Sequence, residues 1–99
     1  FRLYGTVERL SLPLHIRAKV EGKSSFGREG VAIHVTAGFV DPGFQGNLTL
    51  EFKHLGDYAF LLKRGMRVAQ LEFAFLDKPA THAYRGKYQG QSGVTPAKW

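Results

Sequence analysis

The chain contains no cysteine and no long apolar run. Without cysteine it has no disulfide and no thiolate metal site, which agrees with a cytoplasmic location. A membrane-spanning helix needs about 20 consecutive apolar residues, and no segment approaches that length. We therefore expect a cytoplasmic protein with no membrane partner.

Several well-defined catalytic and metal-binding motifs are also missing. The four histidines, at positions 15, 34, 54 and 82, show no His-x-x-x-His spacing, so we interpret them as structural or surface residues. The zinc deaminase signature requires two cysteines and is therefore absent. No Walker loop, Gly-x-Ser-x-Gly or dinucleotide-binding fingerprint occurs. These motif-based function classes are excluded.

Positive charge is plentiful but scattered. The 99 residues include 14 Lys and Arg against 8 Asp and Glu, which gives a net charge of +6. Because the cations form no long block, local contacts to phosphate groups are favoured over a nucleic-acid-binding stripe. The alternative is a basic surface that serves only solubility. We expect an anionic ligand such as a nucleotide, and no nucleic acid.

Alternation of apolar and polar residues predicts many short strands and no long helix. A length of 99 residues corresponds to one domain, and a hydrophobic fraction of 43% suffices for a packed core. The predicted strands cover residues 3–12, 15–21, 31–36, 48–53, 58–62 and 67–75. Turn signals occur at 55–57 and 64–65. The pattern indicates an all-β sandwich or barrel core over residues 1–76, followed over residues 77–99 by a C-terminal tail or lid of the same domain.

Two acidic residues stand at unequal distances from one tight turn. Asp41 begins an Asp-Pro-Gly turn that Pro and Gly explain by themselves. Glu51 lies between Leu50 and Phe52 in a predicted strand, where acidic residues are depleted. Glu51 is therefore a candidate general acid/base, and Asp41 a candidate for orienting a water molecule. The alternatives are a solvent-facing Glu51 and an Asp41 that forms the turn through its own side chain.

Two polar segments are candidates for binding an anion. Residues 22–28, Gly-Lys-Ser-Ser-Phe-Gly-Arg, interrupt the strand pattern. They form either a polar loop with a helical turn capped by Ser24 or Ser25, or a site where hydroxyl groups, N–H groups and cations meet a phosphate. Residues 84–93 combine glycines with cations and two tyrosines. They form either a disordered tail or a lid that closes over an anion.

Five segments, in order, carry a resemblance to a known family. They are residues 22–28, 34–44, 46–52, 65–71 and 86–96. Each is weak alone, but together, with matching spacing over nearly the whole chain, they resemble the dCTP deaminase branch of the dUTPase superfamily. Members of that family usually carry a substantial N-terminal portion before the segment that begins near Phe1.

The resemblance implies a single all-β domain, a dUTPase-like β-barrel (β-clip, or distorted jelly roll), assembled as a homotrimer with active sites between subunits. It implies hydrolytic deamination of dCTP to dUTP and ammonia without zinc, with Mg2+ bound mainly through the substrate triphosphate. Some members also hydrolyse dUTP to dUMP and diphosphate. Two other functions stay open: dUTP diphosphatase activity alone, and a non-catalytic nucleotide-binding remnant.

The resemblance also implies catalytic roles. Glu51 matches the proton-transfer carboxylate, while Ser24 and Arg28 match the partners that hold and activate the attacking water. Ala37 matches a position whose backbone places that water beside the pyrimidine. Asp41 matches the carboxylate that dUTPases use to activate the water attacking phosphorus, so both activities are open.

Further positions match the substrate-binding residues of the family. Lys23 stands where an arginine usually faces the triphosphate, which keeps the charge but loses bidentate geometry. Ser25 supplies a second hydroxyl group next to that of Ser24. Tyr84, Lys87 and Gln91 lie in the tail that would close over the phosphates.

Overall fold

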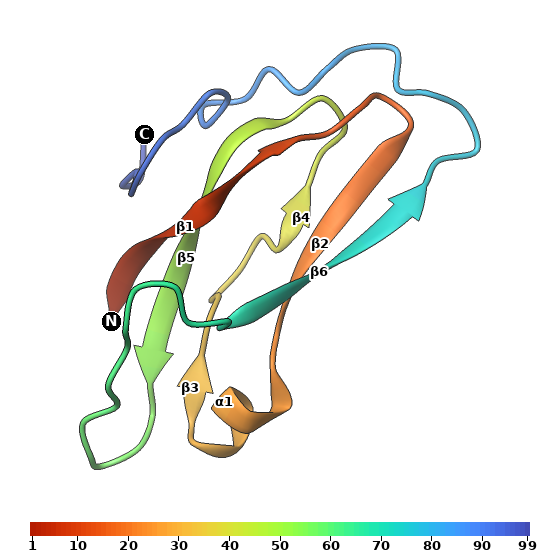
Figure 1. Ribbon diagram of the computed structural model, residues 1–99. Helices are drawn as coiled ribbons and strands as arrows, with labels where there is room; N and C mark the ends of the chain where they lie inside the picture. Colours follow the sequence, from red (N-terminus) through yellow and green to blue (C-terminus); the bar gives the residue numbers. More distant parts are fainter.

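Six strands form two three-stranded antiparallel sheets in the computed structural model, which describes residues 1–99 (Figure 1). One sheet has the order β1-β5-β3 and the other β4-β2-β6. The elements are β1 (Arg2–Ser11), β2 (Ile16–Gly22), α1 (Ser24–Arg28), β3 (Val31–Ala32), β4 (Phe39–Val40), β5 (Gln45–His54) and β6 (Ala69–Phe75). The all-β prediction is therefore confirmed. None of the helical structure is long and apolar enough to span a membrane.

The hydrophobic core gathers apolar side chains from both sheets and from α1. In β2 the alternating Ala18 and Val20 are buried, and in β5 Leu50 and Phe52 are buried. The period-two alternation that predicted these two strands is thus confirmed. The ten core residues are Leu12, Ala18, Val20, Phe26, Val31, Ile33, Val40, Phe44, Leu50 and Phe52.

Three predicted strands differ from the structure, over residues 31–36, 58–62 and 67–75. Residues 58–62 form no strand, although Phe60 packs its ring against Phe26 with the centroids 5.4 Å apart. Phe60 and Leu62 are partly buried against the core, but the segment has no neighbouring strand with which to exchange N–H···O=C hydrogen bonds. The strand predicted over residues 67–75 begins only at Ala69, where pairing with β2 starts.

The short helix α1 confirms the helical turn that is one interpretation of residues 22–28. Lys23 occupies the N-cap position with extended backbone angles, and no side chain caps the helix. The prediction of a cap by Ser24 or Ser25 is wrong, because both serines lie inside the helix, whereas a capping residue must have a non-helical backbone. The buried Phe26 anchors α1 to the core.

The C-terminal segment, residues 83–95, runs along β5 (Figure 1). The Asn47 N–H donates to the carbonyl oxygen of Gln91 at 3.0 Å. The side-chain amide of Gln89 donates to two main-chain carbonyls, and its oxygen accepts from a β5 N–H. At Gly46 a Cβ atom would lie 2.7 Å from the Gln91 carbonyl oxygen, so only glycine permits this approach. The segment is therefore packed against the sheet rather than extended into solvent.

Candidate active site

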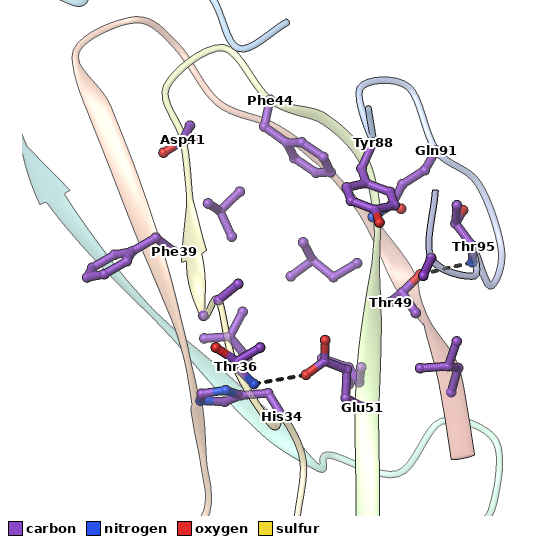
Figure 2. A pocket seen from close by; sticks show the side chains of 18 of the residues that line it. His34, Thr36, Phe39, Asp41, Phe44, Thr49, Glu51, Tyr88, Gln91 and Thr95 are labelled. Atoms are coloured by element: carbon purple, nitrogen blue, oxygen red, sulfur yellow. Dashed lines mark hydrogen bonds between the residues drawn. The ribbon is translucent and has the colours of Figure 1, made fainter. Parts of the chain in front are cut away.

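A cavity of about 560 Å3 lies between β5, the segment from His34 to Asp41 and the C-terminal segment (Figure 2). Twelve of its 20 lining residues are hydrophobic, which is typical of a site that holds a small ligand with a few polar contacts. Among the predicted site residues, the cavity brings together Ala37, Asp41, Glu51, Tyr84 and Gln91.

Glu51 is held at this cavity by main-chain donors from a distant part of the chain. One carboxylate oxygen, Oε2, accepts from the N–H of Val35 at 2.7 Å and from the N–H of Thr36 at 3.0 Å. The second oxygen makes no hydrogen bond within the chain, and Figure 2 shows it directed into the cavity. Leu50 and Phe52, its neighbours on β5, are buried and keep the strand in place. The arrangement fixes the side chain and leaves one carboxylate oxygen open to a ligand.

The same contacts explain why the strand predicted over residues 31–36 ends at Ala32. The carbonyl oxygen of Ile33 still accepts from the Glu51 N–H at 3.1 Å. Beyond that point the Glu51 side chain, rather than a strand, accepts the next N–H groups. Ala37 then turns the chain with φ at 60°, a left-handed conformation that costs about 1–3 kcal/mol for a residue with a Cβ atom. Backbone strain and a fixed carboxylate therefore meet at one edge of the cavity.

Asp41 lies in a turn that does not depend on its carboxylate. The Asp41 carbonyl oxygen accepts from the Phe44 N–H at 3.1 Å, with Pro42 and Gly43 (φ 82°) between them. This is the arrangement of a type II turn, in which Pro fixes one φ and Gly supplies the positive one. The carboxylate makes no hydrogen bond or ion pair. In Figure 2 it lies at the opposite end of the cavity from Glu51.

Aromatic rings form one wall of the cavity. The rings of Phe44 and Tyr84 lie with their centroids 5.9 Å apart, and Figure 2 shows Phe44 and Tyr88 projecting inward. Flat apolar faces of this kind suit a planar base. Sequence reasoning missed Phe44 and Tyr88 as lining residues. The sequence signal that could have identified them is their position in residues 34–44 and 86–96, two segments that carry the family resemblance.

Two further polar residues, Thr49 and His34, were also missed as lining residues. The Thr49 hydroxyl oxygen accepts from the Thr95 N–H at 3.0 Å, which ties the C-terminal segment to β5 two residues from Glu51 (Figure 2). Period-two alternation puts Thr49 on the same face as Glu51 and was the signal that could have found it. His34 lines the cavity with a buried Nδ1 atom that has no partner, and its place at the start of residues 34–44 was the signal that could have separated it from the other histidines.

The remaining predicted site residues do not line the cavity. They are Lys23, Ser24, Ser25, Arg28 and Lys87. Figure 1 shows α1 beside β3, at the end of the molecule away from the C-terminal segment. Ser24, Ser25 and Arg28 are exposed and make no side-chain hydrogen bond or ion pair. Within one chain, the residues of α1 therefore lie apart from Glu51 and its cavity.

The shifted pKa values lie outside the cavity. Lys19 Nζ lies 2.9 Å from Glu21 Oε1, and this hydrogen bond and charge lower the pKa of Glu21 and raise the pKa of Lys19. The Tyr58 hydroxyl donates to the Glu29 carboxylate, which raises the pKa of Tyr58. No three His, Asp or Glu side chains come together as ligands for a metal ion. Asp41 and Glu51 are the two carboxylates that line the cavity.

Comparison with known proteins gives consistent matches. The family model described as dCTP deaminase-like matches residues 1–76. The chain is 50% identical over 98 residues to "dCTP deaminase, dUMP-forming" of Aquifex aeolicus, covering 99% of this chain and 54% of that protein. Proteins of the same name from Persephonella marina and Corynebacterium efficiens are 48% and 45% identical over 98 and 103 residues, again covering 99% of this chain and 54% and 53% of theirs. The chain spans about half the length of these relatives.

Proposed function

The chain belongs to the dCTP deaminase-like family, and from this premise we propose that it catalyses the hydrolytic deamination of dCTP to dUTP and ammonia. The observation that carries the proposal is the Glu51 carboxylate, which two N–H donors hold at a cavity while its other oxygen stays open. The names of the relatives support dCTP as the substrate.

In the proposed reaction, a water molecule adds to C4 of the cytosine ring. Glu51 takes a proton from that water and returns protons to the ring and to the amino group, which leaves as ammonia. The left-handed backbone at Ala37 lies next to the Glu51 contacts and would help place the water. Tyr88 and Phe44 would cover the faces of the base. The reaction consumes one water and needs no zinc.

We also propose a second step, hydrolysis of dUTP to dUMP and diphosphate. Asp41 supports it, because its carboxylate lines the same cavity as Glu51 and has no partner within the chain. Asp41 would activate the water that attacks phosphorus. The words "dUMP-forming" in the names of the relatives agree with this step.

Magnesium belongs to the proposal as an ion carried by the substrate. Magnesium prefers oxygen ligands and usually binds through one or two carboxylates together with substrate phosphates. The chain supplies no group of three carboxylates or histidines, whereas a triphosphate supplies several oxygens. We therefore assign the ion mainly to the triphosphate, with Asp41 as the carboxylate of the cavity that would contact it.

A homotrimer with active sites between subunits completes the proposal. α1 lies outside the cavity of its own chain, so Ser24 and Arg28 would reach the Glu51 of a neighbouring subunit. Exposed aromatic side chains support an interface between subunits, since Phe39 and Phe75 are 66% and 80% exposed. In that arrangement Lys23 and Ser25 would face the triphosphate, and Gln91 would approach it from the C-terminal segment.

The proposed function is tested by incubating the protein separately with dCTP and with dUTP, with magnesium present, and resolving the products. Ammonia and dUTP from dCTP indicate deamination, and dUMP from both substrates indicates the two-step reaction. Conversion of dUTP alone indicates a diphosphatase. Binding without turnover indicates a non-catalytic remnant, and either of these last two results refutes deamination.

The position of the site between subunits has its own test. Arg28→Ala and Glu51→Gln chains are each expected to be inactive. Mixed, denatured and refolded together, they should regain ammonia release, because mixed trimers contain some sites with an intact Arg28 and an intact Glu51. A mixture as inactive as its parents would show that both residues act from the same chain.

A further inference from the structure

The five-residue helix α1 is held at its C-terminal end by the turn that follows β5. The Leu55 N–H donates to the carbonyl oxygen of Gly30 at 2.8 Å. The Tyr58 hydroxyl donates to the carboxylate of Glu29, the C-cap residue of α1, from 29 residues further along the chain. Figure 1 shows α1 and this turn at the same end of the molecule. A helix this short is marginal by itself, so such distant contacts fix where it lies.

Aromatic neighbours hold Tyr58 in turn. The His54 ring meets the Tyr58 ring edge-on, with the centroids 5.1 Å apart. The Phe60 ring lies 6.0 Å from that of His54 and 5.4 Å from that of Phe26, the buried side chain of α1. A packed cluster therefore presents the Tyr58 hydroxyl to Glu29, which lowers the entropy cost of the hydrogen bond.

The same hydrogen bond gives the Glu29 carboxylate a partner other than the adjacent Arg28. A carboxylate and a guanidinium that meet attract each other, and pairing would occupy the charge of the arginine. The one ion pair of the structure joins Lys19 to Glu21, so Arg28 has no carboxylate partner. Engagement of Glu29 by Tyr58 thus goes together with a free guanidinium on α1.

We propose that Tyr58 is a positioning residue, which acts through Glu29 to fix α1 in the place that the shared active site requires. Ser24 and Arg28 are the residues that α1 would bring to the Glu51 of a neighbouring subunit. Neither Tyr58 nor Glu29 belongs to the segments that carry the family resemblance, so their contacts alone assign the role. The inference rests on the proposed function for the reaction, whereas the hold on α1 needs no substrate.

The first test measures hydrogen exchange of main-chain N–H groups by NMR, without substrate. In Tyr58→Phe, the N–H groups of Glu29 and Gly30 should exchange about tenfold faster, because the lost hydrogen bond to a carboxylate frees the end of α1. The Val20 N–H, bonded in the other sheet, should stay within about twofold. Tyr4→Phe is the matched control, because the Tyr4 hydroxyl makes no hydrogen bond and Tyr4 does not line the Glu51 cavity. Unchanged exchange in Tyr58→Phe overturns the proposal.

The second test follows ammonia release from dCTP. Tyr58→Phe and Glu29→Ala should each lower kcat about 10-fold to 100-fold, because misplaced groups lose much of their effect. The double variant should lose no more, because both changes remove the same hydrogen bond. The KM should change less than about threefold, since Tyr58 holds the end of α1 next to Arg28, whereas Lys23 lies at its other end. A wild-type kcat in Tyr58→Phe, or a double loss equal to the product of the single losses, overturns the inference.

Mixed trimers locate the effect of Tyr58. For a tenfold defect, Tyr58→Phe chains refolded with Glu51→Gln chains should release ammonia about fivefold faster per Tyr58→Phe chain, because half of the intact Glu51 carboxylates then receive an unaltered α1. Mixing with Arg28→Ala should give no gain. No gain with Glu51→Gln, while Arg28→Ala and Glu51→Gln restore each other, overturns the inference and leaves deamination standing. Absence of deamination in the wild type, with faster exchange in Tyr58→Phe, refutes the proposed function and keeps the hold on α1.

Discussion

Replacing Glu51 with glutamine should stop deamination and leave the fold in place. Glutamine keeps a carbonyl oxygen where Oε2 lies, so the N–H groups of Val35 and Thr36 retain their acceptor. What disappears is the negative charge and the ability to take up a proton. The variant therefore separates the two tasks of this side chain, holding the loop and transferring protons.

The expected loss of stability is small, whereas the expected loss of reaction rate is large. Hydrogen bonds to a charged group contribute about 1.5–3 kcal/mol and those between neutral groups about 0.5–1.5 kcal/mol, so each of the two bonds weakens by about 1 kcal/mol. Partial exposure of the site reduces the total to about 1 kcal/mol, or a fall in Tm of about 4–8 °C. Loss of a general acid/base costs about 100-fold to 10,000-fold in rate. Activity should therefore vanish while most of the stability remains.

The assay follows ammonia release from dCTP, with urea denaturation and calorimetric dCTP binding on the same samples. Glu51→Ala is the structural comparison, because it removes the acceptor of both N–H groups and should cost about 1–2 kcal/mol more than Glu51→Gln. Glu72→Gln makes the same chemical change at an exposed position of β6 and should stay active. Ammonia release by Glu51→Gln within tenfold of the wild type would refute proton transfer by this residue. Equal stability of the Ala and Gln variants would refute the role of its hydrogen bonds.

Three other perturbations test separate parts of the argument. Asp41→Asn should stop dUMP formation while dUTP and ammonia still form, and chromatography that finds undiminished dUMP would contradict the second step. Gly46→Ala should lower the free energy of unfolding in urea by about 2 kcal/mol, because the new Cβ would lie 2.7 Å from a main-chain oxygen and φ is 147°. Gly27→Ala, a helical position with nothing within 4 Å, should instead raise it by about 0.5–1 kcal/mol, and a reversed order would show that the C-terminal segment is not seated on β5. The hydrogen bond to Glu29 raises the pKa of Tyr58, so its contribution to stability is complete below the ordinary value of 10.0 and is lost as pH rises through the folded value. Ultraviolet titration of tyrosinate should detect this raised pKa, and its persistence after Glu29→Gln would disprove the cause.

Local sequence predicted those parts of the fold whose cause is local. The alternation in β2 and β5 arises because successive strand residues point to opposite faces, and only one face of each strand is apolar. The turn at Asp41 follows from Pro42, which fixes its own φ, and from Gly43, which adopts a positive φ without steric cost. Residues 58–62 show the limit, because they have the composition of a strand but no partner. Pairing depends on what lies alongside, which composition does not specify.

The sequence by itself determined that the domain is all-β, that Glu51 lies in a core strand, and which segments resemble a family of nucleotide enzymes. Only the tertiary structure decided what surrounds that carboxylate. The donors that hold Glu51 come from 15 and 16 residues earlier in the chain, and the C-terminal segment that closes the cavity reaches β5 from more than 40 residues away. Such contacts form because the core buries β5 beside these segments, and burial of that kind is a property of the whole chain. The same packing puts α1 outside the cavity, which is why a complete site is proposed to need a second subunit.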